Sequence, residues 1–207
     1  MTIMSETEIR SGVQLPMVNS AAARRLSDTS WPFERGINLS LVLLGFSAAS
    51  YAVEGRIAAM VVALCACALV LVAMRIATSA ISIWLTALLL IHVVLGMTLH
   101  CYDSWPHFDD ALHFGAVGWL THIALGSLQN SDKWLNRALS CRQLAVVGII
   151  FALAMGAMWE LFEFAVDLTG AYVSQLGLAD TMADIAAGAL GGAAGSCYRY
   201  SVDKGDG

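Results

Sequence analysis

The sequence predicts an all-α membrane protein with six transmembrane helices and both termini in the cytoplasm. Of its 207 residues, 58% are hydrophobic and only 13% are charged, whereas about 25% of residues are charged in an average soluble domain. The apolar residues gather in runs of roughly 17–25 residues, the length that a helix needs to cross a hydrocarbon core about 30 Å thick. The sequence does not show the alternation over about ten residues that marks the strands of a membrane barrel.

Six apolar runs are expected to form the helices of one membrane domain, residues 36–199. A polar segment, residues 1–35, precedes this domain, and we expect it to be a disordered cytoplasmic tail. A short cytoplasmic tail, residues 200–207, is expected after it. In chain order, the expected helices cover Ile37–Val53, Ile57–Ala73, Ala80–Leu99, Asp110–Leu128, Leu144–Leu168 and Ala179–Tyr198.

The distribution of Lys and Arg predicts the orientation, because these residues gather on the cytoplasmic side of a membrane. With six spans, all of the 11 Lys and Arg residues except Arg56 fall on the side of the two termini. The loops Cys101–Asp109 and Thr169–Leu178 are then expected outside, which in a bacterial inner membrane means the periplasm. The formal net charge of −5 is therefore divided between a basic inside and an acidic outside, without a basic patch for nucleic acid.

Six ionisable residues lie within or at the ends of the last three apolar runs. An ionisable group at bilayer depth costs about 2.5–3.5 kcal/mol on insertion scales, so such residues usually mark a functional site. We expect these six to form one site, with Asp184, Glu160 and His113 as its catalytic members. The full set is Asp110, His113, Glu160, Glu163, Asp180 and Asp184.

Within each of these helices the candidate residues lie three or four positions apart, so they share one helix face. In the predicted topology the fourth and sixth helices begin, and the fifth ends, on the outer side of the membrane. All three pairs are therefore expected at the same depth. Two alternatives stay open, since Asp109 or Asp110 could instead cap the fourth helix, and Asp180 could cap the sixth.

Small residues continue the acidic stripe of the last helix, at Gly188, Gly192 and Gly195. Small residues at this spacing allow a second helix to approach closely. The face Gly188–Gly195 could pack within the chain or join two copies as a homo-oligomer. Of the five cysteines, only Cys101 is expected on the outer, oxidising side, where it has no partner, so a disulfide framework is not expected.

These motifs can be written as D-x-x-H-F, W-E-x-x-E-F and D-T-x-x-D-x-x-x-G-x-x-G-G-x-x-G. Over about residues 80–198 the chain resembles the YjdF-like inner-membrane proteins, a family without an assigned activity. It is more distantly similar to VanZ-like proteins. This chain has Glu163 where the VanZ-like pattern has a Gln, and Asp184 where that pattern has an Asn. The resemblance implies a multi-pass protein of the bacterial inner membrane. The matching residues are Asp110, His113, Glu160, Glu163, Asp180, Asp184 and Gly188.

Carboxylates together with an imidazole are ligands that Mg²⁺, Mn²⁺ or Zn²⁺ accept. The first hypothesis is therefore a metal-dependent enzyme that acts on a membrane-embedded, lipid-linked substrate. A proton- or cation-coupled transporter is an alternative, because intramembrane acids also form ion relays. A second alternative is a non-catalytic scaffold or partner subunit, in which the acids and His113 hold helices together. A haem site at His92 and His113 is a further alternative.

Overall fold

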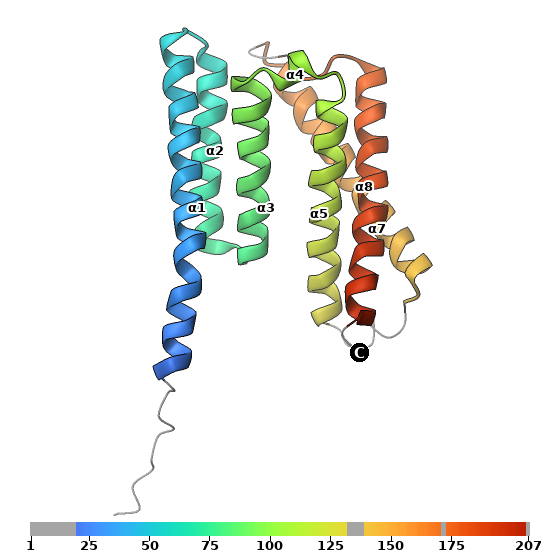
Figure 1. Ribbon diagram of the computed structural model, residues 1–207. Helices are drawn as coiled ribbons and strands as arrows, with labels where there is room; N and C mark the ends of the chain where they lie inside the picture. Colours follow the sequence, from blue (N-terminus) through green and yellow to red (C-terminus); the bar gives the residue numbers. More distant parts are fainter. Residues whose placement is uncertain (1–19, 132–138, 171–172, 206–207) are drawn as a thin grey trace, which may run out of the picture. The chain divides into compact units, whose positions relative to one another are not determined.

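The structure is a computed structural model that describes residues 20–131, 139–170 and 173–205, and these residues are helical apart from short connections (Figure 1). Side chains are described for residues 35–129, 139–170 and 173–202. The chain divides into two compact units, Met1–Asn38 and Leu39–Gly207. All candidate site residues belong to the second unit.

Two short connections join the first three helices of the chain. Helix α1 covers Ser20–Val53, and helix α2 covers Ile57–Ile76. Gly55 has φ +72°, a left-handed conformation that favours glycine, and it makes the short turn between them. Helix α3 (Ser79–Leu90) begins after Thr78, whose Oγ1 accepts a hydrogen bond from the backbone N–H of Ile81 (3.4 Å).

Helix α3 continues without a break into a π-helix, η1 (Ile91–Thr98). The wider turn is visible in the bond from the backbone N–H of Leu99 to the carbonyl oxygen of Val94 (2.9 Å). The carbonyl oxygen of Val93 accepts a hydrogen bond from Thr98 Oγ1 (2.9 Å), and Thr98 in turn hydrogen-bonds Tyr51 of α1 (2.7 Å). Contacts with another helix therefore stabilise this wider turn, which an α-helical sequence pattern does not encode.

The remaining described elements carry the candidate site. A one-turn helix, α4 (Cys101–Ser104), lies in the loop before α5 (Phe108–Ser131). Helix α7 covers Cys141–Asp167 and begins with a capping box formed by Ser140 and Gln143. Helix α8 covers Leu178–Gly205.

Among the described residues, five helical segments are long and apolar enough to cross a membrane. They coincide with five of the six expected spans, which are thereby confirmed as helices long and apolar enough to span. The sixth expected segment forms α8, which is less apolar than α2 or α7 because glycines and acids interrupt its sequence. That α8 spans the membrane, and the orientation of the chain, stay predictions. The five segments are Arg35–Val53, Ile57–Ile76, Ser79–Thr98, Phe108–Gln129 and Cys141–Asp167.

The structure differs from the expected tails at both ends of the membrane domain. Helix α1 begins at Ser20, so residues 20–35 are helical rather than irregular. This segment contains alanines, arginines and Leu26, which have high helix propensity. At the other end α8 continues to Gly205, through most of the expected tail 200–207. Residues 1–19 and 206–207 lie outside the described residues, and the domain boundaries at 35 and 199 stay predictions.

Helix α8 packs against both α5 and α7 of the same chain (Figure 1). A methyl group added at Gly191 would collide with the carbonyl oxygen of Phe114, and one at Gly195 with that of Gly118. On the other side, a methyl group at Gly192 would come within 2.9 Å of the carbonyl oxygen of Gly148. The helix backbones are thus in direct contact, and the Gly188–Gly195 face is buried within one chain.

Candidate metal centre

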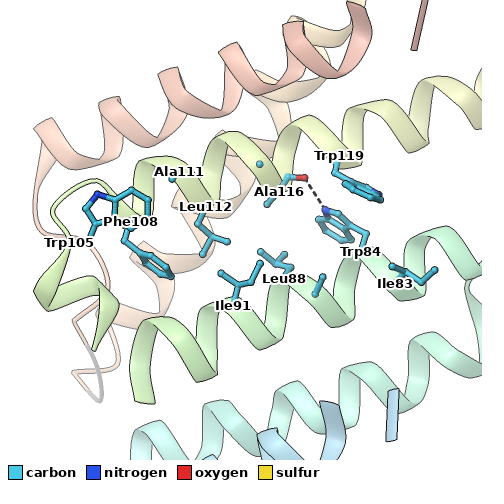
Figure 2. Close-up of a pocket in the computed structure, with 12 residues that line it drawn as sticks. Ile83, Trp84, Leu88, Ile91, Trp105, Phe108, Ala111, Leu112, Ala116 and Trp119 are labelled. Atoms are coloured by element: carbon cyan, nitrogen blue, oxygen red, sulfur yellow. Dashed lines mark hydrogen bonds between the residues drawn. The ribbon is translucent and has the colours of Figure 1, made fainter. Parts of the chain in front are cut away.

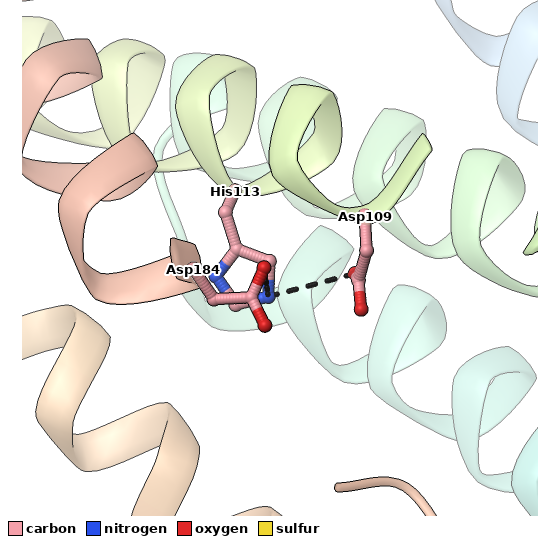
Figure 3. A group of neighbouring side chains, drawn as sticks. All are labelled: Asp109, His113 and Asp184. Carbon is pink, nitrogen blue, oxygen red and sulfur yellow. Dashed lines mark ion pairs between the residues drawn. The ribbon is translucent and has the colours of Figure 1, made fainter. Parts of the chain in front are cut away.

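Three side chains from two helices meet near the beginnings of α5 and α8 (Figure 3). Asp109 and His113 come from α5, and Asp184 comes from α8. Each offers one ligand atom, and these atoms lie within 4.8 Å of one another. His113 Nε2 lies 3.6 Å from Asp109 Oδ1 and 4.0 Å from Asp184 Oδ1. We call these three residues the Asp–His–Asp cluster.

Local helix geometry and helix packing together bring these residues into one place. Asp109 and His113 are four positions apart and therefore share a face of α5. One turn further along α5, Val117 packs against Gly188, which is one turn beyond Asp184 on α8. The two helices therefore run side by side in matched register, and this register places Asp184 against His113.

The cluster is mostly buried and carries more negative than positive groups. His113 is 8% exposed and Asp184 is 3% exposed, while the side chain of Asp109 is 35% exposed. The two distances from His113 are too long for hydrogen bonds. Glu160 of α7 is also buried, and it repels both Asp109 and Asp184 electrostatically. Buried acids that one imidazole does not balance need either a further positive partner or bound protons.

Glu160 has one carboxylate oxygen with a partner and one without. Its Oε2 accepts a hydrogen bond from Gln175 Nε2 (2.9 Å), which also donates to the backbone oxygen of Glu160 (3.0 Å). Its Oε1 is buried and finds no hydrogen-bond partner among the residues that the structure describes. An unsatisfied buried acceptor costs about 1–3 kcal/mol, and more when it is charged. This buried oxygen is therefore open to a ligand.

The structure brings only some of the six predicted site residues together. His113 and Asp184 belong to the cluster, and Glu160 interacts electrostatically with it. The carboxylate of Asp110 pairs instead with His107 (3.1 Å).

The other two predicted acids have local hydrogen-bond partners. Glu163 Oε1 accepts a hydrogen bond from the indole N–H of Trp159 (2.9 Å), and Asp180 Oδ2 accepts one from the backbone N–H of Leu176 (3.2 Å). Asp180 thus binds the chain just before α8, close to the capping role that was its alternative. It still lies near enough to Asp184 for their charges to repel.

Two residues of this region were not among the predicted site residues. Asp109 was treated as a cap, although its spacing of four from His113 also permitted a shared face. Gln175 had no signal in the sequence, because a single amide in a loop has no periodicity. The loop is held by Asp167, whose carboxylate accepts hydrogen bonds from the backbone N–H groups of Ser174 (2.7 Å) and Gln175 (3.1 Å).

The donor atoms of the cluster fit a divalent metal ion. Ligand atoms bound at about 2.0–2.2 Å from one ion lie at most about 4.4 Å apart, and the distances from His113 Nε2 to Asp109 Oδ1 (3.6 Å) and Asp184 Oδ1 (4.0 Å) fall within this limit. Two carboxylates and one imidazole suit Zn²⁺ or Mn²⁺, and Mg²⁺ prefers the oxygen donors. The group Asp109, His113 and Asp184 could therefore hold a metal ion.

Comparison with known proteins assigns the chain to a family. No curated protein and no solved structure matches the chain. A family described as "Predicted membrane protein (DUF2238)" matches residues 35–204, which include every helix of the site and the five apolar spans. The chain therefore belongs to the DUF2238 family of multi-pass membrane proteins.

Proposed function

We propose that this protein is a metal-dependent enzyme of the bacterial inner membrane that acts on a membrane-embedded, lipid-linked substrate. The observation that carries the proposal is the buried, unpartnered Oε1 of Glu160, whose carboxylate interacts electrostatically with Asp109 and Asp184 of the Asp–His–Asp cluster. A cluster of acids alone would be weak support, but a buried acceptor left open on an acid that interacts with it indicates a missing ligand. The resemblance to YjdF-like proteins, and more distantly to VanZ-like proteins, supports the inner-membrane location.

Each residue then has a chemical role. Asp109, His113 and Asp184 would hold the ion, which supplies a Lewis acid for a phosphoryl or carbonyl oxygen of the substrate. Glu160 would accept a proton through its open Oε1 and act as the general base. Gln175 would orient Glu160 through the hydrogen bond to Oε2. Asp109 is the most exposed of the three ligands, so the substrate would approach from its side.

A purely structural role explains the cluster less well. The close contact of α5 with α8 is already provided by the glycine face. Polar side-chain pairs in membranes contribute about 0.6 kcal/mol on average, which is small beside an insertion cost of about 2.5–3.5 kcal/mol per ionisable group. Holding the helices together is therefore an insufficient reason for these buried acids.

Two neighbouring acids allow a matched test of the metal centre. The protein would be purified in mild detergent, supplied in turn with Mg²⁺, Mn²⁺ and Zn²⁺, and analysed for bound metal. We expect about one ion per chain, and at least ~10-fold weaker binding in Asp109→Asn and Asp184→Asn. Asp110→Asn is the control, because Asp110 carries the same charge one residue away but pairs with His107.

Two results would overturn the metal centre. One is a wild-type protein that binds none of the three ions, and the other is equal loss of metal in Asp109→Asn and Asp110→Asn. The enzymatic part needs its own measurement. Total bacterial lipids would be incubated with the metal-loaded protein or with Glu160→Gln, and compared by mass spectrometry. We expect a lipid whose headgroup changes only with the wild type, and identical lipid profiles would contradict an enzyme.

A further inference from the structure

An apolar groove of about 410 Å³ lies between α3 and α5 (Figure 2). Its volume falls within the roughly 300–1,000 Å³ that is usual for ligand pockets. At 100° per residue, the α5 side chains that line it occupy the face next to the one that carries the cluster. Lining residues at its two ends and middle include Trp105, Phe108, Leu88, Leu112, Trp84 and Trp119.

The groove is suited to hydrocarbon rather than to water. The indole N–H of Trp84 donates to the backbone oxygen of Ala116 (2.8 Å), so this polar group is already satisfied (Figure 2). Ile83 and Trp119 are 45% and 57% exposed, which opens the groove sideways. Both walls belong to candidate membrane spans, Ser79–Thr98 and Phe108–Gln129. In a membrane protein, the medium beside such spans consists of lipid chains.

The length of the groove matches one leaflet. From Phe108 to Trp119 it extends about 16 Å along α5, at ~1.5 Å per residue. This is about half of a hydrocarbon core that is ~30 Å thick. A single lipid chain that entered at the beginning of α5 would therefore follow the groove to about the middle of the bilayer.

The end of the groove at the beginning of α5 lies next to the cluster. Phe108 lines the groove, and Asp109, the following residue, is the most exposed member of the Asp–His–Asp cluster. Both are in the first turn of α5. A lipid with a chain in the groove would therefore place its polar headgroup beside Asp109.

We propose that the groove binds one hydrocarbon chain of the lipid whose headgroup is bound by the cluster. This inference rests on the proposed function and specifies the substrate class as a membrane lipid that is held by one chain. An acyl chain and a polyprenyl chain share this chemistry, and the test below separates them.

Gly115 provides a substitution that fills the groove. It lines the groove, and a methyl group added to it would meet nothing within 4 Å. Gly115→Phe should therefore occupy the groove without colliding with the backbone. Gly45 of α1 is the matched control, since it is also exposed and open in another candidate span.

The measurement is lipid retention by native mass spectrometry, after extraction from phosphatidylglycerol vesicles with or without a polyprenyl phosphate. We expect one lipid per chain to survive a detergent wash in the wild type and in Gly45→Phe. In Gly115→Phe and in the smaller Gly115→Leu we expect at least ~10-fold less retained lipid. Retention of only phosphatidylglycerol identifies an acyl chain, and preferential retention of the second lipid identifies a polyprenyl chain.

The inference is overturned if the Gly115 variants retain lipid as the wild type does, or if Gly45→Phe loses it equally. Metal binding by the Gly115 variants would show that they are folded. The two proposals can fail separately. A groove that retains lipid in a protein without metal would contradict the proposed enzyme, whereas metal binding without Gly115-dependent retention would contradict only the groove.

Discussion

Two adjacent acids at the beginning of α5, Asp109 and Asp110, have different partners. Asp109 and Asp110 are four and three positions before His113, and both spacings permit a shared helix face. The structure directs Asp109 toward α8, while Asp110, rotated by about 100°, turns toward His107. The choice depends on which face of α5 packs against α8, and no local pattern contains that information.

Removing the amide of Gln175 should weaken both the protein and the metal centre. Gln175→Ala leaves two oxygens of Glu160 without their donor, which should cost about 1–3 kcal/mol of unfolding free energy. As an outer partner of the site, its loss should also lower metal affinity about 10–100-fold. Thermal unfolding in detergent and metal titration measure the two effects. Ser201→Ala is an exposed control, and wild-type values in Gln175→Ala would contradict this role.

Neutralising Glu160 should stabilise the metal-free protein and should reduce the additional stability that metal binding provides. Glu160 repels Asp109 and Asp184, so Glu160→Gln should stabilise the metal-free protein by on the order of 1 kcal/mol. The same variant should gain less stability when metal is added, because a ligand stabilises in proportion to how tightly it binds the folded state. Unfolding temperatures recorded with chelator and with excess metal test this. A Glu160→Gln protein that is less stable than the wild type in chelator would show that the repulsion is not significant.

At the scale of elements, hydropathy predicted more than side-chain pattern did. Five of the six expected spans are confirmed as helices long and apolar enough to cross a membrane, and the sixth apolar run lies within a longer helix, Leu178–Gly205. The π-helix η1 was not predicted, because the wider turn depends on Tyr51, more than forty residues away, and on Thr98. The glycine face of α8 was predicted as a packing face, but its partners, α5 and α7, became known only from the structure.

The glycine contacts between α5 and α8 predict that the same Gly→Ala substitution lowers the free energy of unfolding at one position and raises it at another. Gly191→Ala forces a methyl group into the backbone of Phe114 and should cost about 1–3 kcal/mol of unfolding free energy. Gly115→Ala meets open space and should instead stabilise the helix by about 0.5–1 kcal/mol. Unfolding in mixed micelles with increasing dodecyl sulfate measures both. Equal effects of the two substitutions would mean that the helix backbones are not in contact.

At the scale of the whole molecule, the distribution of charge and the position of the cluster together predict the side of the membrane on which the substrate is bound. If α8 spans the membrane, the beginnings of α5 and α8 and the end of α7 share a side, and the cluster lies near that face. The bias of Lys and Arg predicts that this face is outside. The substrate would then be in the outer leaflet, where a headgroup can reach Asp109 from the periplasm.

Single cysteines in a cysteine-free background test this orientation. Asp103 lies in the loop before α5 and Ser140 lies just before α7, and both are exposed. We expect Asp103→Cys to react with a membrane-impermeant maleimide in intact bacterial cells whose outer membrane has been permeabilised. Ser140→Cys should react only after the inner membrane is opened, because Lys133, Arg137 and Arg142 predict that its loop is cytoplasmic. The reverse labelling pattern would move the cluster to the inner leaflet and restrict the substrate to lipids that face the cytoplasm.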